Sequence, residues 1–125
     1  MTEISLGSTI DGRFLLEEVA GSGGMGAVYR ARDLDRDQRV AVKILHPTMQ
    51  SHMPRFVREA RLLAQLEHPA IVRHVAHGES PPYLAMEWLD GEDLGQRLGR
   101  APLLVREALA MTRRVAEALA AAHRK

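Results

Sequence analysis

The chain has 125 residues, of which 46% are hydrophobic and 26% charged, a composition that suits one domain large enough to bury a core. Seventeen Lys and Arg residues against sixteen Asp and Glu residues leave a formal net charge of +1, which excludes a bulk attraction to nucleic acid or to an anionic membrane. The absence of cysteine excludes disulfides, thiolate zinc sites and cysteine nucleophiles, and since the sequence shows no signal peptide or membrane-spanning stretch we expect a cytoplasmic protein.

Three short strands are predicted in the first third of the chain. The segments Phe14–Ala20, Ala27–Arg32 and Arg39–Leu45 are rich in Val and Leu, and a glycine cluster and a polar turn at residues 33–37 separate them. Short connections of this kind join antiparallel neighbours, so the order predicts an antiparallel meander.

The hydrophobic period changes to that of a helix at Pro54. Phe56 and Ala60 share one helical face, and a proline suits the first helical turn. His68-Pro69 predicts the end of this helix, because the residue before a proline is driven out of the α region.

Two strands and two helices are predicted in the second half. The strands are Ile71–Ala76 and Tyr83–Trp88, with a turn at residues 77–82 between them. A short helix follows at Glu92–Leu98, and a longer one runs from Pro102 to about His123 with an apolar stripe along one side.

A glycine-rich segment joins the first two predicted strands, with the sequence Gly21-Ser22-Gly23-Gly24-Met25-Gly26-Ala27-Val28. In this G-x-G-x-x-G-x-V pattern, a loop without Cβ atoms lets backbone N–H groups close on phosphate oxygens. The pattern alone also describes a hairpin with no ligand. A dinucleotide-binding turn is disfavoured, because that turn must open a helix and the residues after it here alternate as in a strand.

One lysine interrupts the third predicted strand, Val40-Ala41-Val42-Lys43-Ile44. Strand alternation places Lys43 on the same face as Ala41. If that face lines a cleft under the glycine loop, Lys43 can reach the α- and β-phosphates of a nucleotide. On this strand alone, a snorkelling surface lysine is the preferred interpretation.

Glu59 lies beside the apolar face of the first predicted helix. An inward carboxylate needs a partner, and Lys43 is the natural one, because an unpaired buried charge is costly. The alternative is a solvated Glu59 paired with Arg55 or Arg58 within its own helix. The sequence leaves both arrangements open.

Five motifs in this order resemble the N-terminal lobe of protein kinases: the glycine pattern, V-A-V-K at residues 40–43, R-E-A at 58–60, H-P-A-I-V at 68–72 and L-A-M-E-W-L-D-G at 84–91. The Gly-Gly-Met-Gly loop and the run at residues 90–94 are especially similar to bacterial serine/threonine kinases. The resemblance covers Phe14 to Lys125. It implies an α+β fold with a five-stranded antiparallel sheet, one packed helix, then a short helix and a long C-terminal helix.

The resemblance divides the chain into three parts. Residues 1–13 would form an N-terminal extension, residues 14–91 the small lobe with its hinge, and residues 92–125 the start of the large lobe.

An ATP site is implied by the same resemblance. The phosphates would be covered by the loop residues Gly21, Ser22, Gly23, Gly24, Met25 and Gly26. Lys43 would hold the α- and β-phosphates, Glu59 would hold Lys43, and Asp93 would meet the ribose.

The adenine ring would be enclosed by three small or branched side chains, Ala20, Val28 and Ala41. Ala20 stands where the family usually has a larger aliphatic residue, which would thin this contact. Met86 would gate the back of the pocket, and the hinge backbone at Glu87 and Leu89 would bond the adenine edge.

The catalytic elements of the family are absent from these 125 residues. Kinases need a catalytic-loop Asp, an Asn for one magnesium ion and a D-F-G Asp for the other. Since neither the catalytic loop nor D-F-G occurs, we expect the chain to stop before the catalytic loop, with no catalytic residue, no Mg²⁺ ligand and no activity alone. A complete parent would use ATP and Mg²⁺ on a protein substrate.

A second hypothesis is that the chain is a non-catalytic regulatory fragment that binds a nucleotide or a partner protein. The apolar stripe of the last helix, at Val105, Leu109, Ala116 and Leu119, would then mediate self-association or partner binding.

Six histidines raise the question of a metal site. His74 and His77 lie three apart in a predicted strand, which places them on opposite faces, and the others are scattered. A zinc site is therefore not expected.

Overall fold

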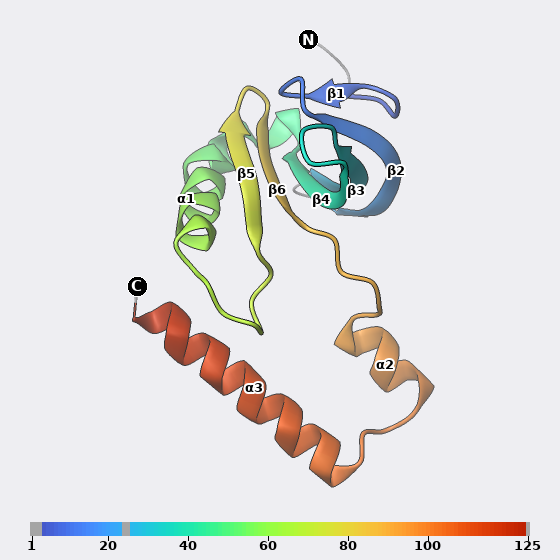
Figure 1. Cartoon of the computed structure of the whole chain (residues 1–125), viewed down its shortest axis with the longest axis vertical. Coiled ribbons are helices and arrows are strands. Elements are labelled where there is room, and N and C mark those ends of the chain that lie inside the picture. The colour runs from blue at the N-terminus through green and yellow to red at the C-terminus, as the bar shows by residue number, and fades with distance from the viewer. Residues whose placement is uncertain (1–3, 24–25, 125) are drawn as a thin grey trace.

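The computed structural model describes residues 4–23 and 26–124. Six strands are found in these ranges: β1 (Thr9–Ile10), β2 (Phe14–Gly23), β3 (Gly26–Asp33), β4 (Gln38–Leu45), β5 (His74–Glu79) and β6 (Pro82–Glu87). They form one curled antiparallel sheet in the order β1-β2-β3-β4-β6-β5. Helix α1 (Met53–Ala64) packs against β5 and β6, and α2 (Leu94–Arg100) and α3 (Val105–His123) follow beyond the sheet (Figure 1).

The predicted α+β fold is confirmed, with one strand more than predicted. The extra strand, β1, has two residues, too few for an alternation pattern to show in the sequence. The strand predicted from Ile71 begins at His74 instead. A turn precedes it, closed by the Ile71 N–H, which donates to the His68 carbonyl at 3.0 Å.

Helix α1 begins near its predicted start and ends early. A 3₁₀ helix, η1 (Pro47–His52), leads into it, and Pro54 lies in the first turn as predicted. The last α-helical residue is Ala64, because the N–H groups of Gln65 and Leu66 bond to carbonyls only three residues back. The prediction that the helix reaches His68-Pro69 is therefore wrong by about one turn.

Alternation along the strands builds the core. Val40, Val42 and Ile44 of β4 are buried on one face of the sheet, inside its curl. The rings of Phe14 and Tyr83 meet there with centroids 5.7 Å apart. Burial raises the pKa of the Tyr83 hydroxyl, which donates to Asp11 Oδ2 at 2.8 Å.

Three β-bulges shift this alternation. In β2, Glu17 and Glu18 together oppose Arg30, so both carboxylates approach its guanidinium, at 4.0 and 2.9 Å. In β5, Val75 and Ala76 together oppose one residue of β6, and both pack against the core. The third bulge, at Ala20, lies in the candidate site.

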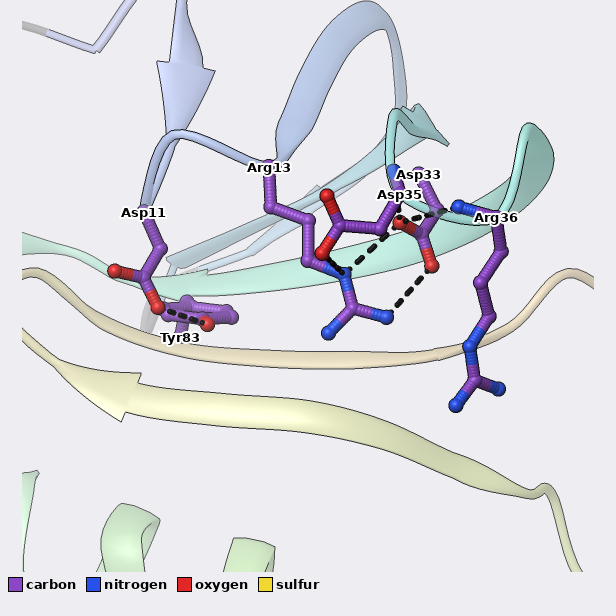
Figure 2. Close-up of polar contacts among 6 residues, drawn as sticks. All are labelled: Asp11, Arg13, Asp33, Asp35, Arg36 and Tyr83. Atoms are coloured by element: carbon purple, nitrogen blue, oxygen red, sulfur yellow. Dashed lines mark hydrogen bonds and ion pairs between the residues drawn. The ribbon is translucent and has the colours of Figure 1, made fainter.

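A buried ion pair fixes the β3–β4 turn. Arg13 donates to both carboxylate oxygens of Asp33, at 2.9 and 2.8 Å, and Asp33 is fully buried (Figure 2). The hydrogen bond from Arg13 is the main cause that lowers the pKa of Asp33. The backbone N–H groups of Asp35 and Arg36 also donate to this carboxylate, at 3.0 and 3.4 Å, and so hold the turn in place.

The two last helices bury little. Asp93 caps α2, accepting from the Gln96 N–H at 2.7 Å, and neither α2 nor α3 has a buried residue. Among the described residues, no helix is long and apolar enough to cross a membrane.

Candidate nucleotide-binding site

The register of the sheet gathers four predicted site residues on one face. Lys43 and Ala41 lie on the face of β4 opposite the buried Val40, Val42 and Ile44. Directly opposed residues of antiparallel strands share a face, and Val28 of β3 opposes Lys43 while Met86 of β6 opposes Ala41. Val28, Ala41, Lys43 and Met86 therefore lie together, as predicted for one wall of a cleft.

The glycine hairpin and Lys43 line one hollow of about 400 Å³, formed by Gly21, Ser22, Gly23, Gly26, Ala27, Val28 and Lys43. Glycine is required at position 26, since a Cβ there would lie 2.1 Å from the Ile44 carbonyl oxygen. The predicted residues Gly24 and Met25, which follow Gly23 in the sequence, lie outside the described residues.

Ala20 lies at the third bulge of β2, where Ala20 and Gly21 together oppose Val28. The earlier bulge at Glu17 shifts the alternation of β2 by one residue, so Ala20, which strict alternation from Phe14 would assign to the core face, lies on the cleft side. Its short side chain is exposed. The thin upper contact expected for adenine stays a prediction.

Glu59 lies away from Lys43 in this structure. Its carboxylate accepts from Arg55 Nε at 3.3 Å, one turn earlier on α1, and 57% of its side chain is exposed. Within residues 4–23 and 26–124, no acidic group forms an ion pair with Lys43. Of the two arrangements that the sequence left open, the structure has the pair within the helix.

The predicted hinge residues lie at and after the end of β6. The Glu87 N–H donates to the Arg73 carbonyl at 2.9 Å, and its carboxylate accepts from the Arg73 N–H at 2.8 Å. These bonds tie the start of the hinge to the segment before β5. Leu89 is 64% exposed, and the Asp93 carboxylate, expected at the ribose, caps α2 instead of standing open.

Two residues of this wall were missed from the sequence. Leu84 opposes Lys43 from β6 and so shares its face, and Ala27 lines the hollow. The alternation of the strand Tyr83–Trp88 already placed Leu84 and Met86 on one face, a signal that would have found Leu84.

The prediction that His74 and His77 lie on opposite faces is wrong. Their rings are hydrogen-bonded, with His74 Nε2 and His77 Nδ1 2.8 Å apart. The bulge in β5 adds one residue between them, so that three positions along the chain return to the same face. Burial lowers the pKa of His74, and the charge of His77 lowers it further. No group of three or more metal-ligating side chains occurs in the described part of the chain.

Comparison with known proteins identifies the family. The family model for the protein kinase domain matches residues 14–125. The chain belongs to the protein kinase family. It is 43% identical over 121 residues to the serine/threonine-protein kinase pkn2 of Myxococcus xanthus. This match covers 93% of the present chain and 15% of pkn2.

Solved kinase structures share this fold. The PknI kinase domain of Mycobacterium tuberculosis has a TM-score of 0.84 at 32% identity, over 98% of this chain and 51% of that one. Rad53 in complex with AMP-PNP has a TM-score of 0.74 at 27% identity, over 89% of this chain and 30% of that one. The resemblance to bacterial serine/threonine kinases is thus confirmed, for a chain that spans about half of the PknI kinase domain.

Proposed function

We propose that this chain is the ATP-binding portion of a serine/threonine protein kinase, which transfers the ATP γ-phosphate to Ser or Thr hydroxyls of a protein substrate. The observation that carries the proposal is the hollow in which Lys43 faces the glycine hairpin. Backbone N–H groups of a glycine-rich loop and one ammonium group are the donors that nucleotide phosphates need. The AMP-PNP bound by Rad53 supports the same class of ligand here.

The adenine ring would pack against the apolar wall beside this hollow. Val28, Ala41 and Met86 share the face of Lys43, and Met86 belongs to β6, the strand that leads into the hinge. Ala20 would add a small contact from above. The carbonyl of Glu87 and the backbone of Leu89 would bond the ring edge, and Asp93 would reach the ribose from the start of α2.

Glu59 would enter the site by a movement of α1. Its present partner is the exposed Arg55, and such a pair within a helix contributes only about 0.3–0.5 kcal/mol. Lys43, which is half-buried in the cleft, would be its partner after that movement, and the pair would then hold the ammonium group in position for the phosphates. Shifts of a packed helix are a recognised way in which kinases assemble this ion pair.

Magnesium would be held mainly by the nucleotide, because the family's metal-binding Asp and Asn do not occur among these residues. Bound magnesium would neutralise charge on the phosphates. Lys43 and the hairpin N–H groups would position those phosphates but could not accept a proton from a substrate hydroxyl. We therefore expect no phosphoryl transfer by the 125 residues alone.

The cytoplasm is the proposed location of the protein, because the ATP-dependent activity of a complete kinase requires the cytoplasmic nucleotide pool.

A regulatory role is the second candidate, favoured by one observation. The stripe of α3 is open, with Val105 77% and Leu109 66% exposed. A fragment that binds nucleotide or associates through this stripe would function without catalysis, either with a second copy of itself or with another partner.

The test is a titration of MgATP into the 125-residue chain, followed by thermal unfolding. Ligand that binds only the folded state raises stability by about 2.7 kcal/mol at a concentration of 100 Kd. We expect a rise for the wild type, its loss in Lys43→Met, and its retention in Arg39→Met, a control that removes an exposed cation from the same strand.

Three results would each contradict one part of the proposal. A wild-type chain whose stability does not change with MgATP would exclude nucleotide binding by these residues. Equal stabilisation of Lys43→Met would remove Lys43 from the site. Phosphate transfer from radiolabelled ATP to a generic protein substrate by the pure chain would overturn the expected inactivity.

A further inference from the structure

The segment before β2 is attached to the sheet by backbone bonds. The Gly7 N–H donates to the Leu16 carbonyl at 2.8 Å, and the Leu16 N–H donates to the Ser8 carbonyl at 3.0 Å. Strand β1 then pairs with the start of β2. The kinase family model begins at residue 14, so the residues of this segment lie outside the region that the model matches.

This attachment brings Ile4 against the back of the sheet. Ile4 is half-buried and packs against the core cluster inside the curl. It also lines a hollow of about 550 Å³ together with Tyr29, Ile44 and Leu45. The neighbouring Leu6, by contrast, is 52% exposed.

The hollow behind Ile4 and the hollow of Lys43 share a wall. Both are lined by the two arms of the glycine hairpin, at Ser22, Gly23, Gly26 and Ala27. Ala27 opposes the core residue Ile44, whereas its neighbour Val28 opposes Lys43, so successive residues of the arm face opposite sides. A shift of the hairpin toward one side therefore changes the space on the other.

Glycines cannot hold this hairpin by themselves. They carry no side chain to pack, and they leave the backbone freer than any other residue does. The apolar residues that line the hollow behind the hairpin are Tyr29, Ile44 and Leu45 of the sheet, Pro47 of η1, and Ile4, which the N-terminal segment supplies.

We propose that Ile4 is a positioning residue that braces the phosphate-binding hairpin from behind, so that the segment 4–13 is a working part of the nucleotide site. The functional consequence rests on the proposed nucleotide binding. The mechanical part does not, because the brace acts on the hairpin whether or not ligand is present. Removing the side chain of Ile4 opens the back hollow and lets the hairpin move away from Lys43.

Amide hydrogen exchange of the whole chain tests the brace without nucleotide. In Ile4→Ala we expect exchange in the arms of the hairpin, residues 21–23 and 26–27, to accelerate about fivefold, while β5 and β6 keep their wild-type rates. Ile4→Val, which keeps most of the packing, should restore slow exchange. Leu6→Ala is the matched control in the same segment and should leave the hairpin unchanged.

MgATP affinity supplies the second readout. We expect the Kd of Ile4→Ala to rise about threefold to fivefold, and that of Leu6→Ala to stay at the wild-type value. Unchanged hairpin exchange in Ile4→Ala would overturn the inference, and so would acceleration spread evenly over the sheet, which would mean a general loss of stability. If the wild type failed to bind MgATP but Ile4→Ala still loosened the hairpin, the proposed function would fall and the brace would stand.

Discussion

The sheet region, residues 4–87, and the helical region, residues 88–124, differ in how they cover their apolar surface. All thirteen buried hydrophobic residues found in the described ranges lie between Ile10 and Ala85. The helical region buries none, although its helices carry leucines and valines at helical spacing. Figure 1 shows the arrangement of the two regions, with the curled sheet and α1 in one part of the molecule and α2 and α3 outside the sheet.

The difference shows which part of the chain can determine its own structure. In the sheet region, alternation, bulges and one buried ion pair all favour the same packing, the agreement between levels that specifies a fold. In α3, the amphipathic pattern forms a helix whose apolar side lies open. The regions meet at a hollow of about 690 Å³ lined by residues such as Leu66, Ile71, Met111 and Leu119. The packing seen here therefore stabilises the helical region much less than it stabilises the sheet region.

The largest effect on stability is expected from removing a large side chain from the core of the sheet. Phe14→Ala should lower the free energy of unfolding by about 3–5 kcal/mol, because Phe14 is fully buried and its removal leaves a cavity. Leu109→Ala in α3 should change it by no more than about 0.5 kcal/mol, since that side chain already faces solvent. Urea unfolding followed by circular dichroism measures both. Similar losses in the two variants would contradict the division into two regions.

An ion pair in each region gives the next comparison. Asp33→Asn should cost about 2–3 kcal/mol, because Asp33 is buried and bonds both Arg13 and the turn backbone. Glu117→Gln breaks the exposed pair with Arg113 on α3 and should cost only about 0.3–0.5 kcal/mol. Urea midpoints at constant slope would show this difference, and equal shifts would mean that burial does not distinguish the pairs.

The pH dependence of the first pair has a definite sign. The folded state lowers the pKa of Asp33, so its contribution is complete above the carboxylate's ordinary pKa and is lost as the pH falls through the lower folded value. The stability difference between wild type and Asp33→Asn should therefore be constant from pH 5 to 7, and should shrink below about pH 4. A difference that grew on acidification would contradict the assignment.

The next largest effect is expected for a substitution in α3 that weakens self-association. The variant Leu109→Glu places a charge in the open stripe and should raise the dissociation constant of any self-association about tenfold or more, equivalent to about 1.4 kcal/mol. Arg113→Gln, whose side chain is 82% exposed on the same helix, is the control. Sedimentation velocity over a range of concentrations measures the change. A wild-type chain that stays monomeric throughout would refute self-association by this stripe.

The sequence predicted most of the sheet and the shared face of Val28, Ala41, Lys43 and Met86, but it missed Leu84 and Ala27. Alternation correctly placed Lys43 with Ala41, and the glycine pattern correctly joined two strands. What it could not predict are features that depend on one inserted residue or on distant partners. A bulge reverses the side of every following residue, which is why His74 and His77 meet.

The position of Glu59 is a feature that depends on distant partners. Helical spacing allowed both Lys43 and Arg55 as its partner, and the outcome depends on how far α1 leans toward β4, which tertiary packing decides. The pair of Arg13 with Asp33 is likewise long-range, since 20 positions separate the two residues. Strand β1 was missed for another reason, because it pairs locally with β2 but has only two residues.

The smallest expected effect concerns His74 and His77, which the bulge brings together in the sheet region. Burial and the neighbouring His77 lower the pKa of His74, so the unfolded chain takes up its proton at a higher pH than the folded chain does. Stability from this source is complete above the ordinary value of 6.5 and is lost as the pH falls from there to the lower folded pKa. Between pH 7.5 and 5.5 the wild type should therefore lose more stability than His74→Gln, which removes the titrating ring.

His123→Gln, at the exposed end of α3, is the matched control from the helical region. Chemical unfolding at several pH values gives the slopes. Equal slopes in wild type and His74→Gln would contradict a lowered pKa of His74 in the folded state. A steeper slope only in the wild type and in His123→Gln would show that the folded sheet region disfavours a charged His74 ring, which lies 2.8 Å from His77.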